Sequence, residues 1–186
     1  MDIEATNRMN SADFVAAYGG VFEHSPWVAE QAFAARPFAS VAHLHQSMVA
    51  AVKTSTRERK LALLRAHPEL AGKEAQAGSM TRSSVAEQAS AGLDRLSSVE
   101  MHRLAELNAG YRAAHGFPFI IAVRHYTKEG IFHEFAQRLS NDSSTELEAA
   151  LAQVYAIARI RLGKILDEDA VRANEASKAF IDSLPA

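Results

Sequence analysis

Apolar residues recur at spacings of three and four positions along most of the 186-residue chain, which is the pattern of helices that bury one face. Polar residues that favour a helix N-cap stand ahead of these stretches, and glycines follow several of them. From this pattern we expect helices that are capped or begun by Ser11, Thr56, Ser84, Ser97 and Thr127. We predict an all-α fold of about seven to eight helices, with a terminal helix over about 168–183.

Two stretches depart from the helical pattern. Residues 117–123, Phe-Pro-Phe-Ile-Ile-Ala-Val, form an apolar run too short for its periodicity to distinguish a strand from a buried extended segment. We therefore predict a short extended apolar segment near 117–123. Residues 70–80 include glycines and polar residues, so we expect a loop of about ten residues there. Loops of that length often carry functional sites.

Composition narrows the class of protein. The length fits a single domain spanning 1–186, with a core over about 11–166, and the contents of 48% apolar and 23% charged residues are ordinary for a soluble globular chain. The net charge is −2 and the Lys and Arg residues are scattered among acids, so we expect no nucleic-acid partner. The first residues lack the pattern of a secretory signal, and no apolar stretch reaches the ~20 residues of a membrane helix. We expect a cytoplasmic protein with no membrane contact.

Several kinds of catalytic centre are not expected. The chain has no cysteine, which excludes disulfides, thiolate zinc sites and a cysteine nucleophile. His-Glu-x-x-His, Gly-x-Ser-x-Gly and phosphate-loop patterns are also absent from the sequence. We therefore expect no metal site, and neither a serine hydrolase of that type nor an enzyme of nucleoside triphosphates.

His67 is the first candidate for chemistry, because it stands directly before Pro68. A proline disfavours helical backbone at the preceding residue, so His67 is predicted at or just past the end of a helix. A helix C-terminus favours a cation, and a protonated imidazole there can give a proton away. The alternative is a histidine that caps the helix and has no chemical role.

Glu87 is a candidate carboxylate about twenty residues later, in the segment Ser84-Val85-Ala86-Glu87-Gln88. Ser84-x-x-Glu87 fits a capping box, in which the glutamate only reaches back to the backbone of the serine. Backbone N–H groups in the first turn of a helix also bind anions. The segment can therefore hold a substrate and supply a carboxylate, or it can serve only as a cap.

Arg161 interrupts the apolar stripe of a late helix, which consists otherwise of Leu147, Leu151, Val154, Ala158 and Ile165. A buried guanidinium without a partner is costly, so we expect it to meet a carboxylate of the protein or of a ligand. The alternatives to ligand binding are a structural ion pair and a long side chain that reaches water. His67, Glu87 and Arg161 together suggest an enzyme site for a small anion.

With these segments in place, the chain closely resembles the OHCU decarboxylases of urate breakdown, where OHCU is 2-oxo-4-hydroxy-4-carboxy-5-ureidoimidazoline. Five ordered segments between about Ser11 and Leu166 carry the resemblance. They are residues 18–27 (YGGVFEHSPW), 67–73 (HPELAGK), 84–88 (SVAEQ) with 91–93 (AGL), 116–121 (GFPFII) and 157–162 (IARIRL). Glu69 and Ala122 depart from the residues that are frequent in the family, aspartate and cysteine, and neither departure removes a reacting group.

The resemblance implies an all-helical, cofactor-free enzyme, often a homodimer, that removes CO2 from OHCU to give (S)-allantoin. It implies that His67 is the acid/base residue and that Glu87 and Arg161 complete the polar site. The substrate-binding positions that it implies are Pro68, Ser84, Val85, Ala86, Glu87, Gln88, Phe119, Ile120, Ile121, Ala122 and Val123.

Two other functions fit the same residues. In a non-catalytic helical interaction module, His67 would be a cap, Glu87 part of a capping box and Arg161 a base that reaches water. In a hydrolase of a related ureide, the same acid/base pair would activate a water molecule.

Overall fold

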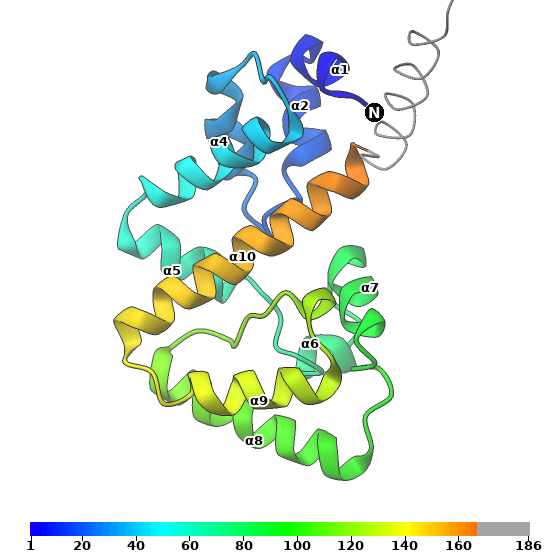
Figure 1. Ribbon diagram of the computed structural model, residues 1–186, viewed down its shortest axis with the longest axis vertical. Coiled ribbons are helices and arrows are strands. Elements are labelled where there is room, and N and C mark those ends of the chain that lie inside the picture. The colour runs from blue at the N-terminus through cyan, green and yellow to red at the C-terminus, as the bar shows by residue number, and fades with distance from the viewer. Residues whose placement is uncertain (167–186) are drawn as a thin grey trace, which may run out of the picture. The chain divides into compact units, whose positions relative to one another are not determined.

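The computed structural model describes residues 1–166, and all regular secondary structure in that range is helical, which confirms the all-α prediction. The helices are α1 (Ile3–Arg8), α2 (Ser11–Tyr18), α3 (Trp27–Ala32), α4 (Val41–Lys53), α5 (Arg57–Arg65), α6 (Lys73–Gln76), α7 (Arg82–Ser90), α8 (Ser98–His115), α9 (Lys128–Arg138) and α10 (Ser143–Ile165), with the 3-10 helices η1 (Phe33–Ala35) and η2 (Val123–His125) (Figure 1). The predicted terminal helix at 168–183 lies outside the described residues.

The described chain divides into two compact units. Unit 1 contains residues 1–21, 26–53 and the described residues from 158 onward, and unit 2 contains residues 22–25 and 54–157. The helix α10 contributes to both, with the division after Ile157. The prediction of a single domain stays a prediction.

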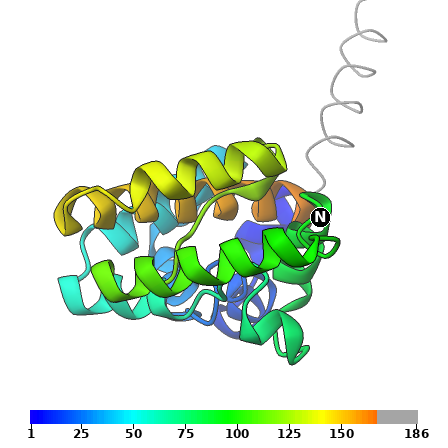
Figure 2. The ribbon, with the colours of Figure 1, turned by 90° about the horizontal axis from the view of Figure 1, so that it is seen from below.

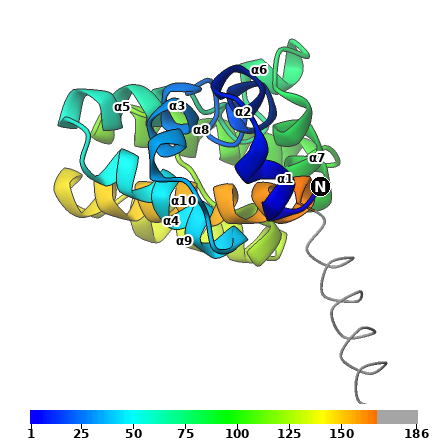
Figure 3. The ribbon, with the colours of Figure 1, turned by 90° about the horizontal axis from the view of Figure 1, so that it is seen from above.

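Unit 1 is built around α2, α3 and α4, and α3 packs against both of the others (Figure 3). Phe14 on α2 is fully buried, and its ring lies 4.9 Å from that of Tyr18, 5.4 Å from that of Phe33 and 5.9 Å from that of Phe38, measured between centroids. Leu44 on α4 is also fully buried. Large buried aromatic side chains of this kind supply much of the hydrophobic stabilisation of a small unit.

Unit 2 contains α8 and α9, which lie side by side (Figures 1 and 2). The Tyr111 ring on α8 makes edge contacts with Phe117, Phe119 and Phe135, at 5.9, 5.3 and 5.7 Å between centroids. The rings of Phe119 and Phe135 stack at 3.9 Å. These contacts hold the extended segment against α8 and α9.

The predicted extended apolar segment is confirmed. Residues 117–122 are neither helical nor paired as a strand, η2 follows at Val123, and every residue of 117–123 is buried. Aromatic packing, rather than a sheet, therefore holds this part of the chain in an extended form.

Four helix ends lie where local sequence signals predicted them. Ser97 and Glu100 form the predicted capping box at the start of α8, and Gly116 ends that helix in the left-handed conformation at φ 76°. Thr56 and Thr127 cap α5 and α9 through their side chains. Each signal acts within a few residues of its own helix, which is why the sequence predicts it.

Three local predictions were wrong. The N-cap of α2 is Asn10, whose side chain accepts from the Asp13 N–H, and not Ser11. The predicted loop at 70–80 contains the four-residue helix α6. The N-cap of α7 is Thr81, so Ser84 is the third residue of that helix.

No helix within residues 1–166 combines the length and the apolar character that crossing a bilayer requires.

Candidate active site

His67 lies just past the end of α5, as predicted, and its side chain is buried. Its backbone N–H donates to the carbonyl of Leu64 at 3.1 Å, and the ring nitrogen Nδ1 lies 2.9 Å from the carbonyl oxygen of Leu63. A carbonyl oxygen only accepts, so Nδ1 carries a hydrogen and donates it. Nε2 is therefore the nitrogen at which this ring gains or loses a proton.

His67 and Pro68 line a pocket of about 80 Å³ in unit 2. Glu23, His24 and Arg65 also lie in its wall. The pocket thus combines an imidazole that is oriented by its own helix, a carboxylate and a guanidinium, which are the groups that bind and protonate a small polar molecule. Glu87 is not among the residues that line it.

Glu23 is the residue of this pocket that the sequence reasoning missed. Its side chain is only 1% exposed, and its Oε1 accepts hydrogen bonds from the Thr81 hydroxyl at 2.7 Å and the Ser84 hydroxyl at 3.1 Å. The available signal was a carboxylate placed next to Val21 and Phe22 within a stretch that carries the family resemblance. Glu23 holds the start of α7 beside the His67 pocket.

Glu23→Ala is expected to lower the free energy of unfolding by about 1–3 kcal/mol, because the Thr81 and Ser84 hydroxyls lose their shared acceptor. Glu23→Gln retains an oxygen that can accept both hydrogen bonds, so its free energy of unfolding is expected to fall clearly less than that of Glu23→Ala. Urea unfolding followed by circular dichroism measures both variants. Equal losses would contradict the role of the accepting oxygen.

The buried face of α7 carries three of the predicted site residues, Ser84, Glu87 and Gln88. Because Thr81 is the N-cap, Glu87 does not occupy the third helical position, and the capping-box interpretation of Ser84-x-x-Glu87 is wrong. The side chains of Val85 and Ala86 are exposed. A substrate role for those two residues stays a prediction.

The backbone of α7 offers fewer donors to an anion than we expected. The N–H of Ser84 donates to the Thr81 hydroxyl at 3.3 Å, and the N–H of Val85 donates to the Thr81 carbonyl at 3.0 Å. Any contact from this segment to a substrate therefore depends mainly on its side chains.

Gln88 joins α7 to the segment that follows His67. Its Oε1 accepts from the N–H of Ala71 at 2.9 Å, and its Nε2 donates to the carbonyl of Glu69 at 3.2 Å. Ala71 has a φ of 46°, a strained conformation for a residue other than glycine. The two hydrogen bonds of one buried amide stabilise that conformation.

The predicted binding segment 119–123 adjoins α7, because η2 packs against α7. The N–H of Ala122 donates to Gln153 Oε1 at 2.9 Å, and the carbonyl of Ile120 accepts from Arg138 Nη1 at 2.8 Å. Unit 2 therefore brings Ser84–Gln88 and the end of 119–123 together, and side chains from α9 and α10 hold the backbone of the second segment.

Arg138 belongs to a buried polar network that the sequence did not predict. Glu146 is fully buried, and its carboxylate accepts from Arg138 Nε at 2.9 Å, from Asn141 Nδ2 at 2.8 Å and from the Tyr111 hydroxyl. Burial and the neighbouring Glu146 carboxylate raise the pKa of the Tyr111 hydroxyl above its usual range. Tyr111 is therefore a permanent donor to Glu146.

Arg161 lies in unit 1, where it is 5% exposed and its Nη1 donates to the carbonyl of Val21 at 3.4 Å. The interpretation as a side chain that reaches water is therefore wrong. The apolar stripe around it is confirmed by the burial of Leu147, Leu151, Val154 and Ala158. Convergence of Arg161 with His67 and Glu87, which belong to unit 2, stays a prediction.

Within residues 1–166, no group of three or more His, Asp and Glu side chains is placed to hold a metal ion.

Comparison with known proteins shows the family. A model of the OHCU decarboxylase family matches residues 7–163. This chain belongs to that family. The 2-oxo-4-hydroxy-4-carboxy-5-ureidoimidazoline decarboxylase of Haloferax volcanii is 43% identical over 164 residues, which are 88% of this chain and 95% of that protein. The predicted family and the class of enzyme, a decarboxylase, are confirmed.

Two solved structures resemble this chain. The crystal structure of an (S)-allantoin synthase aligns with a TM-score of 0.70 and 31% identity, and covers 90% of this chain and 55% of the other. The crystal structure of an OHCU decarboxylase in the presence of (S)-allantoin aligns with a TM-score of 0.64 and 20% identity, and covers 86% of this chain and 99% of the other. The first adds to the evidence for the family, and the second supports the fold.

Proposed function

We propose that this protein converts OHCU to (S)-allantoin and CO2 with His67 as its acid/base residue. The observation that carries the proposal is the buried imidazole of His67, whose Nδ1 is held by the Leu63 carbonyl and whose ring lines a pocket with Pro68 and Glu23. The family of the chain supports the choice of substrate, because its relatives are named for this reaction.

The chemistry needs a proton at one defined position. When the carboxylate of OHCU leaves as CO2, the electron pair of the broken bond forms a double bond between the hydroxyl-bearing and ureido-bearing carbons, and the adjacent ring C=N group accepts the displaced pair on its nitrogen, which takes up a proton. No separate electron sink such as pyridoxal or thiamine is then required. A proton delivered by Nε2 of His67 to one face of the ureido-bearing carbon, while the neighbouring hydroxyl loses its proton and becomes the ring carbonyl, completes (S)-allantoin and defines its stereocentre.

The remaining roles are part of the same proposal. Glu87 orients the hydroxyl or ureido group of the substrate and supports His67. Arg161 contacts the substrate carboxylate or an oxyanion, to which a guanidinium can donate two parallel hydrogen bonds. Pro68, Ser84–Gln88 and Phe119–Val123 form the binding surface. A homodimer, which the family resemblance implies, and a cytoplasmic location, which we expect from the sequence, complete the proposal.

The decisive assay supplies freshly made OHCU to the full chain and follows CO2 release together with the optical rotation of the product. We expect stoichiometric CO2 and dextrorotatory allantoin, with unchanged rates after treatment with EDTA. Consumption of OHCU without CO2 would favour a ureide hydrolase, and no consumption would favour the interaction module. Inhibition by EDTA would contradict the metal-free mechanism.

Arg161→Ala is expected to lower kcat/KM about 10- to 100-fold, the effect of losing hydrogen bonds to a charged group. Because Arg161 also donates to Val21, some loss of stability is expected as well. Added guanidinium ion separates the two effects, since it can restore turnover by occupying the vacated position. A folded Arg161→Ala variant with the parental kcat/KM would contradict the proposed contact between Arg161 and the substrate.

A further inference from the structure

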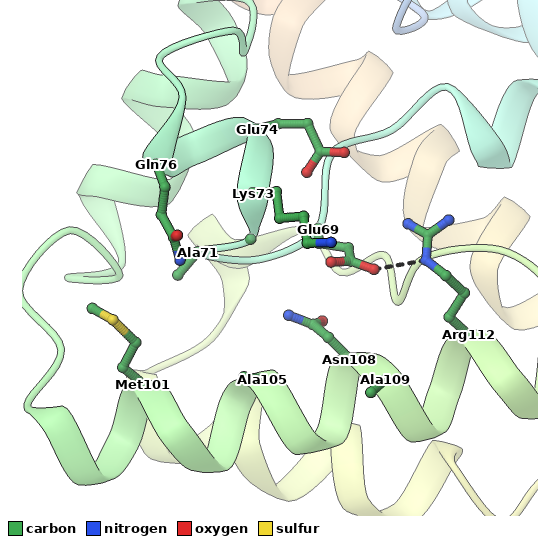
Figure 4. A pocket seen from close by; sticks show the side chains of 11 residues that line it. Glu69, Ala71, Lys73, Glu74, Gln76, Met101, Ala105, Asn108, Ala109 and Arg112 are labelled. Carbon is green, nitrogen blue, oxygen red and sulfur yellow. Dashed lines mark hydrogen bonds and ion pairs between the residues drawn. The ribbon is translucent and has the colours of Figure 1, made fainter.

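A second and larger pocket, of about 560 Å³, lies in unit 2 between the segment Glu69–Gln76 and the helix α8 (Figure 4). None of the residues predicted to bind substrate lines it. Its volume falls in the range of sites that enclose a small molecule, which is ~300–1,000 Å³.

Two buried oxygen atoms in the wall of this pocket have no hydrogen-bond partner. Asn108 is 6% exposed, and its Nδ2 donates to the carbonyl of Leu70 at 3.0 Å while its Oδ1 has no partner. Oε2 of Glu74, across the pocket, also has none (Figure 4). Within residues 1–166, the only other such atoms are the two ring nitrogens of His115. Buried polar groups normally find partners, so two unpaired acceptors at one pocket point to a ligand that donates.

The charges around the pocket balance. Arg112 Nε and Glu69 Oε1 form an ion pair at 2.7 Å, drawn as a dashed line in Figure 4. Lys73 and Glu74 carry one further charge of each sign. With a formal sum of zero, the wall favours neither an anion nor a cation, which indicates a neutral ligand.

The floor of the pocket is apolar. Met101, Ala105 and Ala109 lie on one face of α8 at intervals of four residues, and all three are exposed. A flat molecule can rest on this surface while its edge reaches the polar wall. The two unpaired oxygens lie beneath the surface of the wall, so a contact with such a molecule requires small rotations about χ2 of Asn108, within the limits of its bond to Leu70, and about χ3 of Glu74.

We propose that this pocket is a second binding site for a neutral ureide, a small molecule whose urea or amide N–H groups donate to Asn108 Oδ1 and Glu74 Oε2. The choice of a ureide rests on the proposed function, whose product is one. Glu74 also lines the pocket of His67, so the two sites share a wall residue. A ureide held here lies next to the catalytic pocket. It can be a molecule about to enter that pocket or one that has just left it.

The test is a titration of the 15N-labelled full chain with (S)-allantoin, followed through the side-chain amide of Asn108 and the backbone amide of Gly72. We expect saturable shifts of both signals. Ala105→Phe fills the exposed floor without altering a buried group, and it is expected to weaken this binding at least tenfold. Ala113→Phe is the matched control, because Ala113 is exposed on the same helix but does not line the pocket, and it is expected to bind as the parent does.

Three results would overturn the proposal: no saturable shift at Asn108, unchanged binding by Ala105→Phe, or equal shifts with acetate, an anion that only accepts. The assay with OHCU separates this proposal from the proposed function. If OHCU is not decarboxylated but allantoin still binds in a manner sensitive to Ala105→Phe, the second binding site is supported and the proposed function is contradicted. If decarboxylation proceeds and the Asn108 signal does not shift, only the proposal of a second binding site is contradicted.

Discussion

His67→Asn is expected to lower kcat for OHCU by about 10²–10⁴-fold while the protein remains folded. The asparagine amide nitrogen occupies nearly the position of the imidazole Nδ1, so it can still donate to the carbonyl of Leu63. The substitution removes Nε2, the atom to which we assign the proton transfer. Steady-state kinetics, together with the circular dichroism spectrum and the urea midpoint, measure both halves of this expectation.

The matched control is His133→Asn, because His133 is exposed on α9 and lies outside both pockets. It is expected to retain the parental rate. His67→Asn with near-parental turnover would exclude His67 as the acid/base residue. A variant that loses turnover and also unfolds would be replaced by His67→Gln, which retains an amide near the position of Nε2.

Glu146→Leu is expected to lower the free energy of unfolding by about 3–5 kcal/mol, the usual cost of removing one member of a buried ion pair. Arg138 would retain its charge at 7% exposure, and Asn141 and Tyr111 would lose their acceptor. Because Arg138 also holds the Ile120 carbonyl, we expect a higher KM for OHCU as well. Equilibrium unfolding in urea at a fixed protein concentration measures the loss of stability.

The double variant Arg138→Met with Glu146→Leu is the control for this prediction. Replacing both charges by apolar side chains of similar size leaves no unpaired ion, so the double variant is expected to be more stable than Glu146→Leu alone. A single variant as stable as the parent would show that the ion pair contributes little. A double variant less stable than the single one would assign the loss to packing instead.

Local signals explain which parts of the fold and the site the sequence predicts. The backbone restriction imposed by Pro68 put His67 at a helix end, and the side chains of Ser97 and Thr127 marked the starts of α8 and α9. The start of α7 was not predictable in this way, since both Thr81 and Ser84 can cap a helix. The structure uses Thr81, and both hydroxyls are bound by Glu23, which lies about sixty residues away in the sequence.

The sequence by itself determined that this protein is all-α, that its family is that of the OHCU decarboxylases, and that His67 ends a helix. These properties depend on the spacing of apolar residues, on ordered motifs and on contacts within one turn. Only the tertiary structure decided that Glu23 joins the His67 pocket, that Glu146 holds Arg138, and that Asn108 and Glu74 line a second pocket. Each of these pairings joins polar side chains across the fold. A buried polar group has lost its contacts with water and is stable only with a hydrogen-bonding partner. Only the folded chain determines which partner lies near it.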